Sequence, residues 1–198
     1  LPGVMNLVAE AGIPRFCMYH LVYAGRGSDM VACDTDLETK RRTIELVLEM
    51  TQRFAERGLE LEILTVDNHA DGVYIRNRIA SKQPERLAEV DRLLEMHGGC
   101  SAGTKMSNVD PQGNVHPCQF WGHVTLGNVR ERPFSEIWND PDNELLKGLR
   151  NKQEHLKGRC GSCRRKAICG GCRIRAEAVT GDIWEADPAC YLTDEEIA

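Results

Sequence analysis

The sequence lacks any uninterrupted run of 18 apolar residues, and its first residues contain no basic region followed by an apolar stretch. The first absence argues against a membrane-spanning helix, and the second argues against a secretory signal peptide. From these two absences we expect a cytoplasmic protein with no membrane partner.

An excess of positive charge is also missing, because 25 Lys and Arg stand against 30 Asp and Glu, for a net charge of -5. Proteins that bind nucleic acid through its phosphates need a surplus of Lys and Arg, so we expect no nucleic-acid partner. Of the 198 residues, 41% are hydrophobic, which is enough for the core of one or two globular domains.

Cysteine, by contrast, is abundant, with nine residues. A disulfide framework is not expected in a cytosolic protein, and an odd number would leave one thiol unpaired. Cys17 and Cys33 stand alone in the first half. Isolated cysteines of this kind are more often small buried hydrophobic residues than metal ligands, and we expect the same here. Metal binding is the favoured role of the other seven, which crowd into the second half: Cys100, Cys118, Cys160, Cys163, Cys169, Cys172 and Cys190.

Residues 1–97 alternate between helical and strand patterns. We predict the end of a helix over 1–12, a strand over 15–23, a helix that Thr35 or Asp36 caps and Gly58 ends, a strand over 59–66, and a helix between Pro84 and Gly98. This order predicts an α/β fold with parallel strands, in which chemistry takes place at the carboxyl ends of the strands.

Polar residues follow both predicted strands. His20, Tyr23 and Arg26 come after the first strand, and the second strand leads into 67–72, which we interpret as a polar, ligand-binding loop. After Gly99 the composition changes to Gly, Cys, Pro and short apolar runs, so we expect a second domain from residue 98. Its thin apolar core would depend on bound metal for stability.

The cysteine spacing is Cys100-x12-Gly113-x4-Cys118, then Cys160-x2-Cys163-x5-Cys169-x2-Cys172, then Cys190. Seven thiolates are too many for one tetrahedral ion, so two sites are needed. Zinc and iron–sulfur clusters both bind cysteine thiolates, and the spacing alone leaves both open.

This spacing resembles the SPASM domain, the C-terminal extension of many radical S-adenosylmethionine enzymes, although Cys169 and Cys172 are separated by two residues instead of three. The resemblance implies two auxiliary 4Fe-4S clusters. The outer set of ligands would be Cys160, Cys163, Cys169 and Cys190. The inner set would be Cys100, Cys118 and Cys172, with Leu94 at the place where some members carry a fourth cysteine.

Four segments narrow the resemblance to the radical enzymes of tetrapyrrole biosynthesis: residues 15–27, 67–72, 114–121 and 187–192. By this resemblance, residues 1–97 are the C-terminal part of a partial (β/α)6 barrel and residues 98–198 are the SPASM domain. The chain then resembles a fragment that is inactive alone. It has no C-x3-C-x2-C motif for the radical-generating cluster, since Cys17 and Cys33 are 16 positions apart.

Within this group the chain is most similar to enzymes that decarboxylate the propionates of Fe-coproporphyrin III to vinyl groups. Relatives that process siroheme-derived tetrapyrroles tend to replace some auxiliary cysteines, so Cys118 and Cys172 favour the decarboxylase. The resemblance implies S-adenosylmethionine, a third 4Fe-4S cluster and a reduced ferredoxin or flavodoxin-like electron carrier for the whole enzyme. Three alternatives remain: siroheme-derived side-chain processing, as by a didecarboxysiroheme deacetylase or a heme d1 biosynthesis protein; a peptide-modifying SPASM maturase; and a non-enzymatic metal-binding module.

The resemblance also assigns individual residues. Arginine suits bidentate contact with propionates, so Arg15 and Arg26 are predicted to bind the substrate. Tyr23, which lies between them in the sequence, is the third predicted substrate residue. Cofactor binding is predicted for His20, Asp67, Asn68, His69 and Asp71. A structural role would account for the same five residues. The two histidines would be buried and bonded to backbone carbonyl groups, and the other three residues would form an Asx-turn. The eight Lys or Arg between Lys147 and Lys166 would either dock an acidic carrier or be solvated helix charge.

Overall fold

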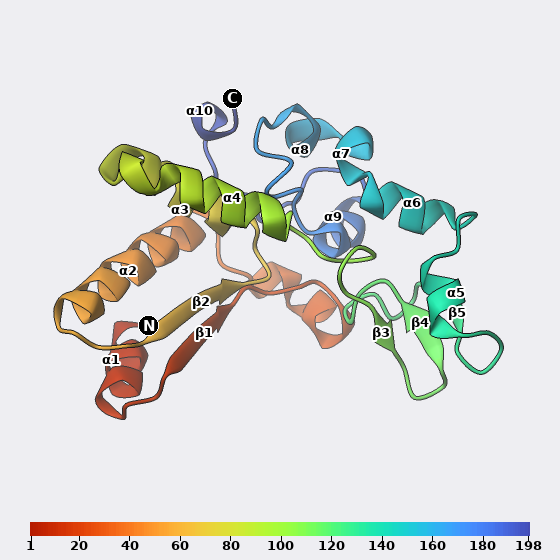
Figure 1. The fold of residues 1–198 in the computed structure, drawn as a ribbon, viewed down its shortest axis with the longest axis horizontal. Helices are drawn as coiled ribbons and strands as arrows, with labels where there is room; N and C mark the ends of the chain where they lie inside the picture. Colours follow the sequence, from red (N-terminus) through yellow and green to blue (C-terminus); the bar gives the residue numbers. More distant parts are fainter.

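The computed structural model describes all of residues 1–198 as a mixture of helices and two small sheets (Figure 1). The first part contains α1 (Pro2–Glu10), β1 (Arg15–Tyr19), η1 (Gly25–Cys33), α2 (Leu37–Glu56), β2 (Glu62–Val66), α3 (Ala70–Lys82), η2 (Pro84–Arg86) and α4 (Leu87–His97). The second part contains β3 (Asn108–Val109), β4 (Asn114–His116), β5 (Gly127–Asn128), α5 (Phe134–Trp138), α6 (Glu144–Arg150), α7 (Lys152–His155), α8 (Gly158–Ser162), α9 (Arg173–Thr180) and α10 (Asp194–Ile197).

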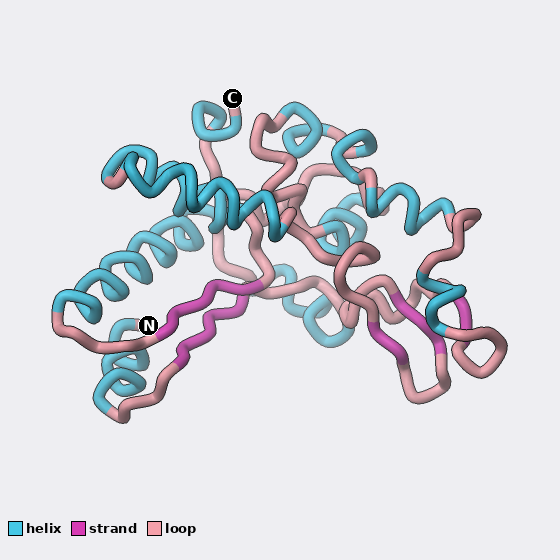
Figure 2. The backbone as a smooth tube through the Cα atoms, viewed as in Figure 1, coloured by secondary structure: helices cyan, strands magenta, loops and turns pink.

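The first sheet consists of β1 and β2, which pair in parallel with Arg15 opposite Glu62 and Tyr19 opposite Val66. Helix α2 connects the two strands, as parallel pairing requires (Figure 2). The predicted parallel arrangement is therefore confirmed. The carboxyl ends of both strands point toward the cysteine-rich half of the molecule in Figure 1.

Helix α2 forms where its cap and its apolar spacing predict it. The Asp36 carboxylate accepts a hydrogen bond from Thr39 N at 2.7 Å, which satisfies one of the free N–H groups of the first turn. One face of the helix is buried through Ile44, Val47 and Phe54. Leu37 stands at the first turn of the helix and is 44% exposed.

The prediction of a loop over residues 67–72 was wrong in its second half, because α3 begins at Ala70. Ala70, Val73 and Tyr74 are spaced for one helical face and are all buried. The polar composition of 67–72 concealed this helix, since Asp71 is 2% exposed and is held by partners far away in the sequence.

The second half is built on a small antiparallel sheet in the order β3-β4-β5, followed by short helices. Val115, Leu126, Ile137 and Leu146 form the apolar core beneath this sheet. The C-terminal segment then returns to the first half, and α10 lies near the upper end of the molecule in Figure 1.

One apolar core crosses residue 98 and joins the two halves. Its members come from α2, α3, the 163–169 segment and the C-terminal tail: Ile44, Ala70, Val73, Tyr74, Cys163, Ile168, Cys169, Tyr191, Leu192 and Ile197. The predicted cluster ligands Cys163 and Cys169 are therefore packed against helices of the first half.

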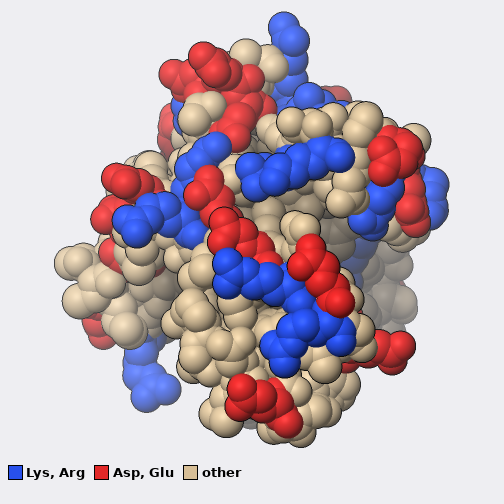
Figure 3. Space-filling model, turned by 90° about the vertical axis from the view of Figure 1, so that its left-hand side faces the viewer, with Lys and Arg blue, Asp and Glu red and all other residues tan.

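Lys and Arg alternate with Asp and Glu over the face on the side of α2–α4, and no broad area of that face carries one sign (Figure 3). An ion pair that joins α3 to α4 is an example, with Arg76 Nε 2.6 Å from Asp91 Oδ1. None of the helices combines the length and apolarity that crossing a bilayer requires.

Candidate metal centre

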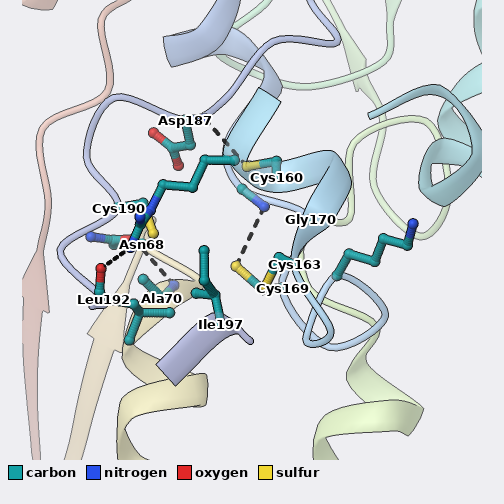
Figure 4. A pocket seen from close by; sticks show the side chains of 13 residues that line it. Asn68, Ala70, Cys160, Cys163, Cys169, Gly170, Asp187, Cys190, Leu192 and Ile197 are labelled. Carbon is teal, nitrogen blue, oxygen red and sulfur yellow. Dashed lines mark hydrogen bonds between the residues drawn. The ribbon is translucent and has the colours of Figure 1, made fainter. Parts of the chain in front are cut away.

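The four cysteines of the outer set line a single cavity (Figure 4). Cys160 lies on α8, Cys163 follows the end of that helix, Cys169 lies in the next loop, and Cys190 comes from the C-terminal tail. Segments up to 30 residues apart thus bring their thiols to one space.

A glycine makes room for this arrangement. Gly171 has a φ of +59°, a left-handed conformation that glycine adopts without steric cost. A Cβ atom at this position would lie 2.7 Å from Asp187 Cβ and 3.3 Å from Cys160 Sγ. The loop can therefore approach the cavity only with glycine at position 171.

Backbone N–H groups point at three of the four outer-set sulfurs. Arg165 N donates to Cys163 Sγ at 3.2 Å, Gly171 N donates to Cys169 Sγ at 3.4 Å, and Asp187 N donates to Cys160 Sγ at 3.4 Å. Hydrogen bonds of this kind stabilise thiolates and are among the features that set the potential of an iron–sulfur cluster. The cavity therefore fits a group held by thiolate ligands.

The inner set lines a second, wider cavity, with Cys100, Cys118 and Cys172 in its wall. Its other wall is the carboxyl end of β2, from Leu64 to His69. The inner thiols thus face the edge of the sheet where the sequence predicted cofactor chemistry. Asn68 is shared, because it lines both cavities.

The backbone connects the two sets directly. Cys100 N, from the inner set, donates to Cys169 O, from the outer set, at 3.3 Å. Gly99, with a φ of +68°, permits this close approach, since a Cβ atom there would lie 1.9 Å from Cys169 O. The two cavities therefore have a fixed relative position.

No three His, Cys, Asp or Glu side chains lie close enough together to bind one metal ion. A tetrahedral zinc ion requires its four ligands around one point, whereas in a 4Fe-4S cluster each thiolate binds a different iron atom. Both groups take thiolate ligands, and the thiols of the two cavities are the residues that would hold either.

Burial raises the pKa of every inner or outer cysteine for which a shift is resolved. It raises the pKa of Cys172 to about 12 and raises the pKa values of Cys118, Cys163, Cys169 and Cys190 as well. These thiols hold their protons at neutral pH in the metal-free protein, so metal binding must displace protons.

Two of the predicted cofactor residues are bonded to each other. His20 Nε2 lies 2.9 Å from Asp71 Oδ2, and the Tyr191 hydroxyl donates to Asp71 Oδ1 at 2.6 Å. All three side chains are buried or nearly so. This triad joins the loop after β1, the first turn of α3 and the residue that follows Cys190.

The residues between β2 and α3 have separate surroundings. Asn68 Oδ1 accepts from Ala70 N at 3.2 Å, which is the Asx-turn left open by the sequence, and Asn68 Nδ2 donates to Ala189 O at 3.1 Å. Asp67 and His69 line the inner cavity. Burial raises the pKa of Asp67 and lowers the pKa of His69 to about 4, so His69 is neutral at pH 7.

The predicted substrate residues do not come together. Arg15 stands at the amino end of β1, away from the cavities, in an exposed ion pair with Glu62 across the strands. Its assignment to the substrate stays a prediction, and the inner cavity lies at the opposite end of the sheet. Tyr23 is buried and donates to Asp34 Oδ2 at 2.8 Å. Arg26 is exposed on η1.

Much of the basic stretch from Lys147 to Lys166 has partners within the chain. Lys147 pairs with Glu144, Lys157 with Asp182 and Arg159 with Asp194. His116, two residues before Cys118, is bonded to Val124 O at 2.6 Å and to Asp110.

Sequence reasoning missed an ion pair in the interior. Arg175 of α9 and Asp187 of the C-terminal segment are bonded through two N–H groups, each at 2.9 Å. Asp187 Oδ2 also accepts from Cys172 N at 2.7 Å. The only local signal was the position of each residue, three places after Cys172 and three before Cys190.

Comparison with known sequences identifies the family of this chain. Residues 100–164 match the model of SPASM, an iron-sulfur cluster-binding domain. The chain is 50% identical to Fe-coproporphyrin III synthase of Methanosarcina barkeri over 100% of this chain and 50% of the relative. It is 44% identical to pre-heme d1 synthase of Dinoroseobacter shibae over 99% and 49%, and 34% identical to AdoMet-dependent heme synthase of M. barkeri over 93% and 50%.

The chain thus spans about half the length of the curated relatives it matches. The matches cover nearly all of this chain, on both sides of residue 98. The chain therefore belongs to the radical S-adenosylmethionine family whose members carry a SPASM domain, in the group that contains these heme and heme d1 synthases.

Proposed function

We propose that the chain is part of a radical S-adenosylmethionine enzyme that modifies the side chains of an iron tetrapyrrole. Residues 1–97 would contribute to a partial (β/α)6 barrel, and residues 98–198 would form the SPASM domain with two auxiliary 4Fe-4S clusters. The parallel pairing of β1 and β2 supports the barrel. The observation that carries the proposal is the division of the seven cysteines between two cavities in the sets that the family motif implies.

The side chains of this chain have defined tasks in that enzyme. The outer cluster would be held by Cys160, Cys163, Cys169 and Cys190, with N–H groups already directed at three of their sulfurs. Bound clusters supply one-electron transfer, and the protein sets their potential. The reducing equivalents would come from a ferredoxin or flavodoxin-like carrier.

The inner cavity is the proposed place where cofactor and substrate meet the auxiliary clusters. Three thiols form one wall, and Asp67 and His69 form part of the other. Because His69 is neutral, its imidazole can accept or donate a hydrogen bond without adding charge. Phe120 and Ile174 in the lining exclude water and suit the face of a macrocycle.

Two tetrapyrrole reactions are the main candidates, and the 44% identity to pre-heme d1 synthase keeps side-chain processing toward heme d1 as a third. The identity of 50% to Fe-coproporphyrin III synthase, against 34% to AdoMet-dependent heme synthase, favours formation of Fe-coproporphyrin III from a siroheme-derived precursor. Retention of all seven auxiliary cysteines, Cys118 and Cys172 included, favours decarboxylation of Fe-coproporphyrin III as the second candidate.

Anaerobic purification of the protein followed by iron and sulfide analysis tests the clusters. Two clusters in this chain predict about eight iron and eight sulfide per chain, in addition to any third cluster of the whole enzyme. Cys160→Ser should reduce the iron content, whereas Cys33→Ser should not, because Cys33 is exposed and lies outside both cavities. Bound zinc without sulfide would contradict the proposal.

The substrate is tested with the full-length enzyme, S-adenosylmethionine and a reductant. Parallel reactions receive didecarboxysiroheme or Fe-coproporphyrin III, and mass spectrometry identifies the products. Conversion of the first to Fe-coproporphyrin III supports the favoured reaction, and conversion of the second to heme supports the alternative. Turnover of neither tetrapyrrole would overturn both assignments.

A further inference from the structure

Two cations are buried beside the cysteine sets without a carboxylate partner. Arg173 is fully buried, and its Nη1 donates only to the carbonyl oxygens of Ile183 and Glu185, at 2.9 and 2.7 Å. Lys152 is 8% exposed, and its Nζ donates to the carbonyl oxygens of Gly98 and Cys100, at 2.9 and 2.6 Å.

The neighbouring Arg175 shows what a compensated cation looks like in the same interior. Its side chain is as buried as that of Arg173, but it faces the Asp187 carboxylate at 2.9 Å. Arg173 and Lys152 form no such pair. Burial of a charge without a counter-charge costs free energy. A negatively charged group bound next to Arg173 and Lys152 would offset that cost.

Arg173 contacts a thiol of the outer set, and Lys152 contacts the backbone that carries the cysteines. Arg173 Nη2 is 3.8 Å from Cys160 Sγ, within the range of a hydrogen bond to sulfur. The Nε of the same guanidinium has no partner. Lys152 contacts the inner set through Cys100 O and also packs beside the outer set, because a Cβ atom on Gly170 would lie 2.9 Å from Lys152 Cε.

We propose that Arg173 and Lys152 are the counter-charges of the two auxiliary clusters and raise their reduction potentials. The inference rests on the proposed function, since it requires clusters in both cavities. A cluster gains one negative charge when it accepts an electron, and a fixed cation a few ångströms away favours that reduced state. Burial keeps the interaction strong, because water and salt do not screen it.

The test is a redox titration of the full-length protein, monitored by electron paramagnetic resonance, with three variants. Arg173→Gln removes the charge, and Arg173→Lys keeps it. Arg164→Gln is the matched control, because Arg164 is an exposed arginine in the segment between Cys163 and Cys169.

Arg173→Gln should reduce the equilibrium constant for reduction of one auxiliary cluster at least tenfold. For one electron, this change lowers the reduction potential of that cluster by about 59 mV. Arg173→Lys should retain most of the wild-type potential, and Arg164→Gln should equal wild type. Lys152→Met should lower an auxiliary potential in the same direction. Unchanged potentials in fully iron-loaded Arg173→Gln and Lys152→Met would overturn the inference and leave the proposed function intact.

Iron content separates an electrostatic role from a packing role. If Arg173→Gln loses iron while Arg173→Lys binds the wild-type amount, the charge itself is required and the inference is supported. If both variants lose iron equally, Arg173 acts through packing and the inference is wrong. Wild-type protein without iron and sulfide would instead contradict the proposed function.

Discussion

Arg175 and Asp187 form a bidentate ion pair whose two side chains are almost fully excluded from solvent, at 0% and 2% exposure. Arg175 Nη1 also donates to Leu21 O at 3.2 Å and to Asp67 O at 2.7 Å, the carbonyl groups that follow β1 and β2. The pair therefore connects the inner-set residue Cys172 and the tail that carries Cys190 to the carboxyl edge of the sheet.

Asp187→Asn should destabilise the protein strongly. Arg175 holds the pKa of the Asp187 carboxyl below its usual range in spite of burial, so the carboxylate is charged at pH 7. Its loss leaves a buried guanidinium uncompensated, at a cost of about 3–5 kcal/mol. Chemical denaturation of the iron-loaded protein measures the effect.

The control for this prediction is an ion pair of the same chemistry on the surface. Glu62→Gln removes the partner of Arg15, but the two side chains are 50% and 61% exposed. This change should cost no more than about 1 kcal/mol, because solvent screens the pair. Similar losses for Asp187→Asn and Glu62→Gln would contradict the role assigned to the buried pair.

Tyr191→Phe tests the triad that joins the tail to the sheet. The variant removes the hydroxyl that donates to Asp71 at 2.6 Å and leaves that carboxylate with His20 as its side-chain partner. Hydrogen bonds to charged groups contribute about 1.5–3 kcal/mol, so the denaturation midpoint should fall accordingly. Tyr19→Phe, at a tyrosine that is 67% exposed, should leave the midpoint within experimental error of wild type.

The sequence predicted those features that local patterns determine. Asp36 and the apolar spacing after it predicted α2, and the alternation of helix and strand predicted the parallel pair. The helix at Ala70 was missed because the polar partners of Asp71 are 51 and 120 residues away in the chain. No local pattern predicts that such distant residues will bury a carboxylate.

The candidate site divides in the same way. The spacing of the cysteines and the family motif predicted the two sets that line the two cavities. The same reasoning predicted Arg15 as a substrate residue from its guanidinium group alone, and the structure places it at the amino end of β1, opposite Glu62. The buried cations Arg173 and Lys152 became apparent only when tertiary contacts were known.

Acid should release the C-terminal tail before it unfolds the rest of the chain. Arg41 on α2 is bonded to both carboxylate oxygens of Glu196 on α10, at 2.8 and 2.9 Å, and this contact lowers the pKa of Glu196. The stabilisation is therefore complete above the ordinary pKa of glutamate and is lost as pH falls through the lowered value in the folded protein.

Hydrogen exchange of residues 191–198 as a function of pH measures this release. Wild-type protein should keep the tail protected at neutral pH and lose that protection at acid pH. Glu196→Gln should show the weakened protection already at neutral pH, with little further change on acidification. A wild-type tail that stays protected throughout the acid range would show that Arg41 and Glu196 do not hold it.

Gly99→Ala should prevent assembly of the cysteine sites. An added Cβ atom would lie 1.9 Å from Cys169 O, so the hydrogen bond from Cys100 N to this oxygen would break and the two sets would separate. Gly12→Ala is the matched control, because Gly12 has nearly the same φ, +63° against +68°, and nothing within 4 Å of the added atom. It should lose about 1–2 kcal/mol from backbone strain and keep its iron. Iron per chain after anaerobic reconstitution distinguishes the two variants, and equal iron contents would show that the Cys100–Cys169 contact is not needed for cluster binding.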